Sequence, residues 1–172
     1  MEQIPQDVIE MAEDFLNHLS MKETGDLLKD FFFEQLFFSE IIISVHKNMK
    51  DQELAKKHNL LFMLIYKCYK YYDIPIPVIS REIILSTHDQ FIKSLSVKPN
   101  QKQTLLEMMM DMKTLIKQDN LMDYLILKVC GTIKNPVTYQ TENDMNLAIS
   151  ETIVIILVLN NEMKKHIGDE IN

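Results

Sequence analysis

Glycine is nearly absent from this chain, and its scarcity limits the possible folds more than any other feature. Gly25, Gly131 and Gly168 are the only glycines among 172 residues, and no two of them are close together. Sheet-rich folds use glycine in many of their turns, so its scarcity favours helices. A phosphate-binding loop needs clustered glycines, because its backbone must approach the anion closely. The sequence therefore argues against nucleotide sites of the P-loop and Rossmann types.

Apolar residues recur at helical spacing along most of the chain and predict an all-α fold. Gly25 is expected to end the first connection, with Asp26, Asp51 and Ser80 capping the helices that follow them. We expect one compact domain over residues 1–172, since a chain of this length suits a single core. The pattern predicts about seven helices, at approximately 6–20, 26–49, 51–72, 80–95, 101–117, 119–131 and 144–166.

The last predicted helix contains the most hydrophobic segment, Ile153 to Leu159. Its isoleucine and valine content also suits a buried strand, but no other segment alternates cleanly enough to pair with it. We therefore expect a helix that is apolar on all sides and lies at the centre of the bundle. The segment is shorter than the roughly 20 apolar residues of a membrane span, so no membrane partner is expected.

The compartment is predicted from the cysteines and the N-terminus. Cys68 and Cys130 lie far apart and outside any CxxC motif, which favours buried thiols in a reducing environment. Residues 1–14 are acidic and lack the apolar run of a secretory signal. We expect a soluble, cytoplasmic protein.

Charge is distributed unevenly around a net value of −7. Residues 1–45 carry ten acids and two lysines, whereas residues 46–72 carry six lysines, two acids and four tyrosines. The overall charge argues against nonspecific nucleic-acid binding, which requires neutralisation of phosphates. The basic segment could offer a local RNA-binding face, but lysines on a solvated helix are the ordinary explanation. The acidic first quarter suits a basic protein partner.

The predicted helix 26–49 carries an apolar stripe on its polar side. Phe33, Phe37 and Ile41 are spaced four residues apart and so share one face of a continuous helix. Neighbouring helices could bury this stripe. Alternatively the stripe is exposed and binds a partner, because large exposed apolar patches usually mark interaction sites.

A second stripe, of polar residues, interrupts the apolar side of the same helix. It consists of Gln35, Ser39 and His46. These side chains could line a polar pocket for a small ligand. Residues of this kind are more often hydrogen-bonded inside a core.

Histidines on apolar faces raise a metal-binding alternative, since neutral imidazole is a common metal ligand. The order His58, His88-Asp89 and Asp119 resembles the H…HD…D pattern of HD-domain phosphohydrolases, an all-helical family that holds divalent metals. The resemblance implies that these four residues are metal ligands. Gln90 departs from the pattern, because a small residue usually follows the HD pair.

No catalytic motif of another class is evident: nucleophile motifs and the paired ExxH of ferritin-like sites are missing. Met108, Met109, Met110 and Met112 give the predicted helix 101–117 a methionine-rich face, which suits either core packing or a partner groove. We therefore expect a protein–protein interaction module, such as an adaptor, regulator or inhibitor, rather than an enzyme. No cofactor is expected, and the partner is another protein or a second copy of the chain.

Overall fold

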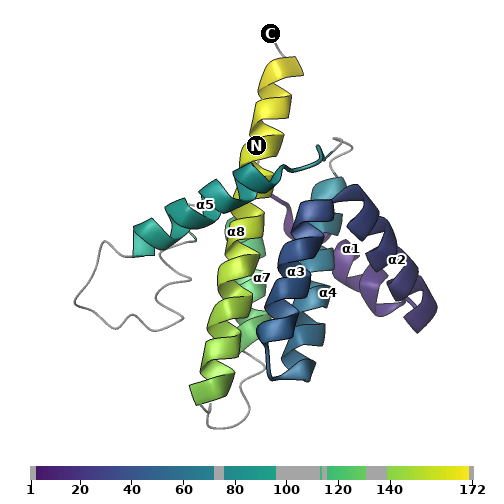
Figure 1. Cartoon of the computed structure of the whole chain (residues 1–172). Helices are drawn as coiled ribbons and strands as arrows, with labels where there is room; N and C mark the ends of the chain where they lie inside the picture. The colour runs from purple at the N-terminus through teal and green to yellow at the C-terminus, as the bar shows by residue number, and fades with distance from the viewer. Residues whose placement is uncertain (1–2, 72–75, 96–112, 114–115, 131–138, 171–172) are drawn as a thin grey trace.

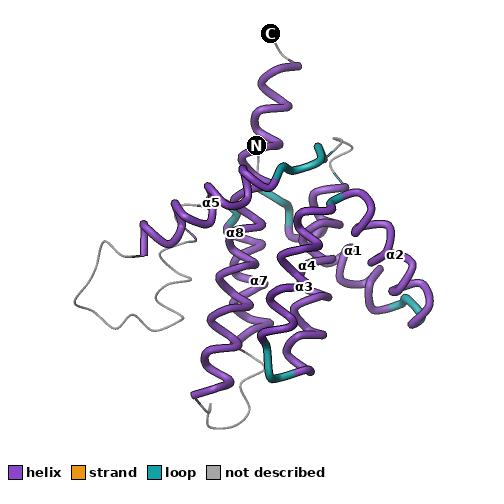
Figure 2. Tube along the Cα trace, in the orientation of Figure 1, coloured by secondary structure: helices purple, strands orange, loops and turns teal. Residues whose placement is uncertain are grey.

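A computed structural model describes residues 3–71, 76–95, 113, 116–130 and 139–170 of the chain. The described residues contain helices and loops but no strand (Figure 2), so the predicted all-α class is confirmed. The predicted helix 101–117, with its methionines, lies almost wholly outside them. The described helices are α1 (Gln6–Asn17), α2 (Met21–Glu34), α3 (Leu36–Asn48), α4 (Gln52–Lys70), α5 (Arg81–Leu95), α7 (Asp119–Cys130) and α8 (Tyr139–Glu170).

The long helix α8 runs through the middle of the molecule, with α4 and α5 packed against it (Figure 1). Ile153, Val154, Ile155 and Ile156 are consecutive and all buried, so every side of the helix is covered here. The prediction of a helix rather than a strand over this segment is confirmed, as is its central place. Asn146–Lys165 is also long and apolar enough to cross a membrane, but most of it is buried inside the bundle, as in a core helix.

Two predicted boundaries near the N-terminus are wrong. The second helix begins at Met21 rather than after Gly25, because Ser20 and Glu23 form a capping box that satisfies its first backbone amides. Gly25 therefore lies inside α2. This helix also ends much earlier than predicted, since the chain leaves helical geometry at Gln35, with φ −132° and ψ 65°, before α3 begins.

The turn between α3 and α4 agrees with the sequence and is tied to α8. The Asp51 carboxylate caps α4 by accepting hydrogen bonds from the backbone amides of Glu53 and Leu54. Asp144 of α8 accepts hydrogen bonds from the amides of Lys50 and Asp51, each at 2.9 Å. Helix α8 begins at Tyr139, so the predicted loop 132–143 is too long at its C-terminal end.

A buried polar network fixes the N-terminal segment against the core. The Gln118 side chain accepts a hydrogen bond from the Ile4 amide at 2.7 Å and donates to Asn160 of α8 at 3.2 Å. Asn160 also accepts from the Tyr69 hydroxyl at 2.7 Å and donates to the Ile116 carbonyl at 3.0 Å. The network links α4, α8 and the chain before α7.

Candidate functional site

The break at Gln35 decides how the predicted Phe33, Phe37 and Ile41 stripe is arranged. The Gln35 side chain is buried; it donates to the Pro77 carbonyl at 2.9 Å and accepts from the Ile79 amide at 3.2 Å. These side-chain contacts with a distant segment accompany the non-helical φ and ψ of Gln35, whose backbone still bonds to Phe31 and Ser39. Phe33 therefore lies on α2, whereas Phe37 and Ile41 lie on α3.

Large apolar side chains are exposed around this junction. Phe33 precedes Gln35 by two residues, Leu36 follows it, and Val78 lies between the two residues that bond to its side chain. Their exposed fractions are 79%, 57% and 70%, values usually found for charged side chains. Ile43 on α3 and Leu85 on α5 are exposed by 44% and 53%.

A groove between α3 and α5 adjoins these residues. Phe37 and Ile41 are half-buried in its α3 wall, and Leu85 forms part of its α5 wall. Its volume is about 170 Å³. The predicted stripe is thus divided between an exposed phenylalanine and two half-buried groove residues. Its role as a partner site stays a prediction. The groove is lined by Phe37, Glu40, Ile41, Ser44, Arg81, Ile84 and Leu85.

The predicted polar pocket residues make separate contacts in the described part of the chain. Gln35 bonds to the segment before α5, and the Ser39 hydroxyl donates to the Gln35 carbonyl at 2.9 Å. His46 lies two turns further along α3, beside His58 of α4. Neither of the two cavities described for this chain includes any of the three residues. The ligand-pocket hypothesis stays a prediction without a supporting contact.

The predicted metal ligands are distributed over three helices. His58 is buried on α4 and its Nδ1 lies 3.4 Å from Nε2 of His46, while His88 on α5 lies 3.8 Å from the Glu151 carboxylate of α8. Asp119 begins α7. In the described part of the chain, no group of three or more histidine, cysteine, aspartate or glutamate side chains is arranged to hold a metal ion. The geometry therefore does not assemble the HD-type set.

Charge surrounds the apolar residues at the α2–α3 junction. Asp30 is exposed one turn before Phe33, and Glu40 is exposed one turn after Leu36. Glu34 is paired with Lys70 and accepts a hydrogen bond from the Tyr66 hydroxyl, and these two donors lower the pKa of the carboxyl. The junction thus presents apolar groups beside acids.

The basic and aromatic segment 46–72 does not form one binding face. Tyr66 and Tyr69 are buried in the core, and Tyr71 is exposed by only 37%. The lysines of α4 lie on its outer side, where Lys67 contacts the ring of Phe15 on α1. Tyr66 and Tyr69 therefore belong to the packing of the bundle, whereas Tyr71 lies at the surface beside Lys67. The RNA-binding alternative stays a prediction.

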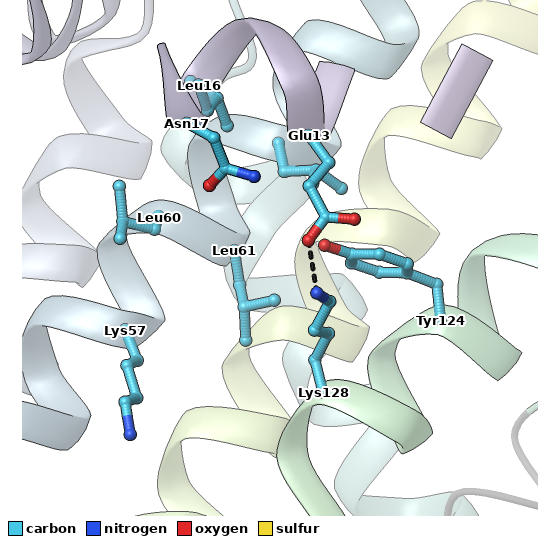
Figure 3. A pocket seen from close by; sticks show the side chains of 9 residues that line it. Glu13, Leu16, Asn17, Lys57, Leu60, Leu61, Tyr124 and Lys128 are labelled. Carbon is cyan, nitrogen blue, oxygen red and sulfur yellow. Dashed lines mark hydrogen bonds and ion pairs between the residues drawn. The ribbon is translucent and has the colours of Figure 1, made fainter. Parts of the chain in front are cut away.

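A larger cavity lies where α1 bridges α4 and α7 (Figure 3). It has a volume of about 260 Å³. Leu61 and Leu64 of α4 form its apolar wall, and Glu13 of α1 is paired with Lys128 of α7 at one end. The lining residues are Glu13, Leu16, Asn17, Lys57, Leu60, Leu61, Leu64, Tyr124 and Lys128.

The sequence alone does not mark out Leu36, Val78, Leu85 or this cavity. Leu36 and Leu85 continue ordinary helical apolar patterns, so nothing local distinguishes them from core residues. Val78 follows Pro77, and nothing in the sequence indicates that its side chain is exposed. The cavity combines three helices that are distant in sequence, which no spacing rule could have brought together.

Comparisons with known protein families, with curated proteins and with solved structures find no significant match.

Proposed function

We propose that this protein is an interaction module that binds a protein partner through the surface formed by Phe33, Leu36, Ile43, Val78 and Leu85. We define these five residues as the junction surface. The observation that carries the proposal is their exposure, which ranges from 44% to 79% in residue types that normally lie in a core. Concentrated exposed apolar side chains are typical of interaction sites.

The adjoining groove supports the same proposal. It offers a recess of about 170 Å³ between α3 and α5, into which a partner could insert an apolar side chain. Amphipathic helices bind grooves of this kind by placing an apolar face against them. Phe37 and Ile41 are then the walls that receive the partner, and Phe33 and Leu36 flank them.

The charges around the junction surface favour a basic partner. Asp30 and Glu40 are exposed next to Phe33 and Leu36, and residues 1–45 have a net charge of −8. Charge complementarity steers association and discriminates against wrong partners. We infer a partner segment in which apolar residues are flanked by lysines or arginines.

The test is affinity capture from the source cell, comparing the native chain with Leu36→Glu and Leu85→Glu variants. Both side chains are more than half exposed, so the variants should retain the helical circular dichroism and the thermal stability of the native chain. We expect at least one protein that the native chain captures and both variants lose.

Leu127→Glu is the matched control. Leu127 is 69% exposed on α7, outside the junction surface, so this variant should capture the same protein as the native chain. Capture that survives both junction variants would contradict the proposed surface. Loss of the captured protein in all three variants alike would contradict a specific site, because binding would then depend on general surface hydrophobicity. A captured partner with an acidic binding segment would contradict the charge argument.

A further inference from the structure

The cavity between α1, α4 and α7 has the composition of a small-ligand site rather than of a packing defect. Leu16, Leu61 and Leu64 line its interior, and Leu60 lies at its mouth with 46% of its surface exposed. Polar groups gather mainly at one edge (Figure 3). Ligand sites commonly combine an apolar lining with a few polar groups that orient the ligand.

The arrangement of the helices explains why the cavity exists. Helix α1 packs closely along α4 and also contacts α7. Side chains of α1, α4 and α7 line the space between the three helices without filling it. Its volume of about 260 Å³ is below the range of drug-sized ligands. Since a cavity of roughly 150 Å³ holds benzene, this one suits a molecule of about ten non-hydrogen atoms.

The polar edge consists of an ion pair that is only partly covered. Lys128 donates to Glu13, and the two side chains keep 42% and 28% of their surface exposed. The Tyr124 hydroxyl also donates to Glu13, and burial together with this hydrogen bond raises the pKa of the phenol. The Glu13 carboxylate is therefore already compensated by two donors.

The two lysines at this cavity carry N–H groups that their carboxylate partners do not use. The Lys128 ammonium has three N–H groups, and the pairing with Glu13 requires one of them. Asn17 adds a side-chain amide at the rim (Figure 3). Lys57 adds a second positive charge at the other end; it is exposed and only loosely paired with Glu53, at 3.4 Å. An anionic head group matches this balance.

We propose that this cavity binds a small amphipathic carboxylate, with its apolar chain against the leucines and its carboxylate on Lys128. The site is separate from the junction surface, so the two proposals can fail independently. A charge-assisted hydrogen bond at a partly exposed site fixes the orientation of the ligand, while burial of the chain supplies most of the affinity.

The test is a titration of the full chain with octanoate, followed by two-dimensional ¹H–¹⁵N NMR. We expect saturable shifts of amides around the cavity, Leu60, Leu61 and Tyr124 among them, with a dissociation constant on the order of 1 mM. Octylamine and octan-1-ol, which have the same chain, should bind at least about fivefold more weakly, because only the carboxylate pairs with Lys128.

Two variants locate the site. Lys128→Gln should weaken octanoate binding about five- to tenfold while leaving octan-1-ol unchanged, and Leu60→Glu should abolish binding of both. Lys165→Gln and Leu85→Glu, at exposed positions outside the cavity, should leave octanoate binding unchanged. Circular dichroism checks that every variant is folded.

Three results would overturn the proposal. One is shifts that do not saturate or that lie away from the cavity, since these indicate an adventitious additive only. Another is octanoate binding that survives Lys128→Gln and Leu60→Glu. Octylamine binding as tightly as octanoate would refute the assignment of an anionic head group, because Glu13 would then be the recognising residue.

Discussion

His58 Nδ1 lies 3.4 Å from Nε2 of His46, so the two imidazoles pair across the contact between α3 and α4. Their rings are tilted by 70°, with centroids 5.6 Å apart. A ring nitrogen can donate here only to a neutral partner ring, which must keep a lone pair. Burial and, to a smaller extent, the neighbouring His46 together lower the pKa of His58 to about 4. Burial also lowers the pKa of His46.

The free energy of unfolding should fall as the pH falls from about 6.5 to about 4. The unfolded chain protonates His58 near its ordinary pKa of 6.5, whereas the folded chain does so only at about 4. Between these values the unfolded state binds more protons, so acid favours unfolding. The contribution of His58 is fully present above pH 6.5 and is at most about 3 kcal/mol. Urea unfolding at several pH values measures it.

The His58→Gln variant isolates this effect. Glu151 has the opposite effect on the pH dependence of stability over part of the same pH range, because burial raises the pKa of its carboxyl. Glu151 is retained in both proteins, so the difference between native chain and variant reports His58. That difference should shrink towards pH 4. Equal slopes for the native chain and His58→Gln would contradict the prediction.

Gln35→Ala should destabilise the fold by about 2–3 kcal/mol. The substitution removes the donor to the Pro77 carbonyl and the acceptor for the buried Ile79 amide, and an unsatisfied buried group costs about 1–3 kcal/mol. Urea unfolding measures the loss. Gln6→Ala, at an exposed glutamine of α1, should change stability by less than about 0.5 kcal/mol. Equal effects of the two changes would mean that the Gln35 contacts contribute little.

The positions of most helices could be predicted where apolar residues recur clearly at helical spacing. The break between α2 and α3 at Gln35 could not be predicted. Residues 26–49 have a helical pattern on both sides of Gln35, and glutamine itself is a good helix former. The break coincides with a pair of side-chain hydrogen bonds to the segment at Pro77 and Ile79, more than 40 residues away. Local propensity carries no information about such a tertiary contact.

The candidate sites were predictable only in part for the same reason. Phe33, Phe37 and Ile41 were identified because their spacing is visible in the sequence, but their division between a surface and a groove depends on the break. His46 and His58, identified separately in the sequence, lie together across the contact between α3 and α4. Leu85 and the cavity beside Lys128 arise from helix packing, which single-chain periodicity does not describe.

Ile156→Ala should be among the most destabilising single changes, by about 2–5 kcal/mol. Ile156 is fully buried in the part of α8 that is covered on every side, so truncation removes apolar burial and leaves a cavity. Leu127→Ala, at an exposed position of α7, should cost less than about 1 kcal/mol. Urea denaturation compares the two. A small effect at Ile156 would contradict a central, tightly packed α8.

Gly25→Ala should stabilise the protein by about 0.5–1 kcal/mol. Gly25 lies inside α2, where glycine is less favourable than alanine by about that amount, and an added methyl group would meet nothing within 4 Å. Two neighbouring substitutions test the helix boundary as well. Ser20→Ala should cost about 1 kcal/mol because Ser20 is the cap, whereas Asp26→Ala should change stability by less than about 0.5 kcal/mol. Thermal unfolding distinguishes a helix that begins at Met21 from one that begins after Gly25. If the helix began after Gly25, Asp26→Ala would cost about 1 kcal/mol and Ser20→Ala less than about 0.5 kcal/mol. Gly25→Ala would then give no gain in stability.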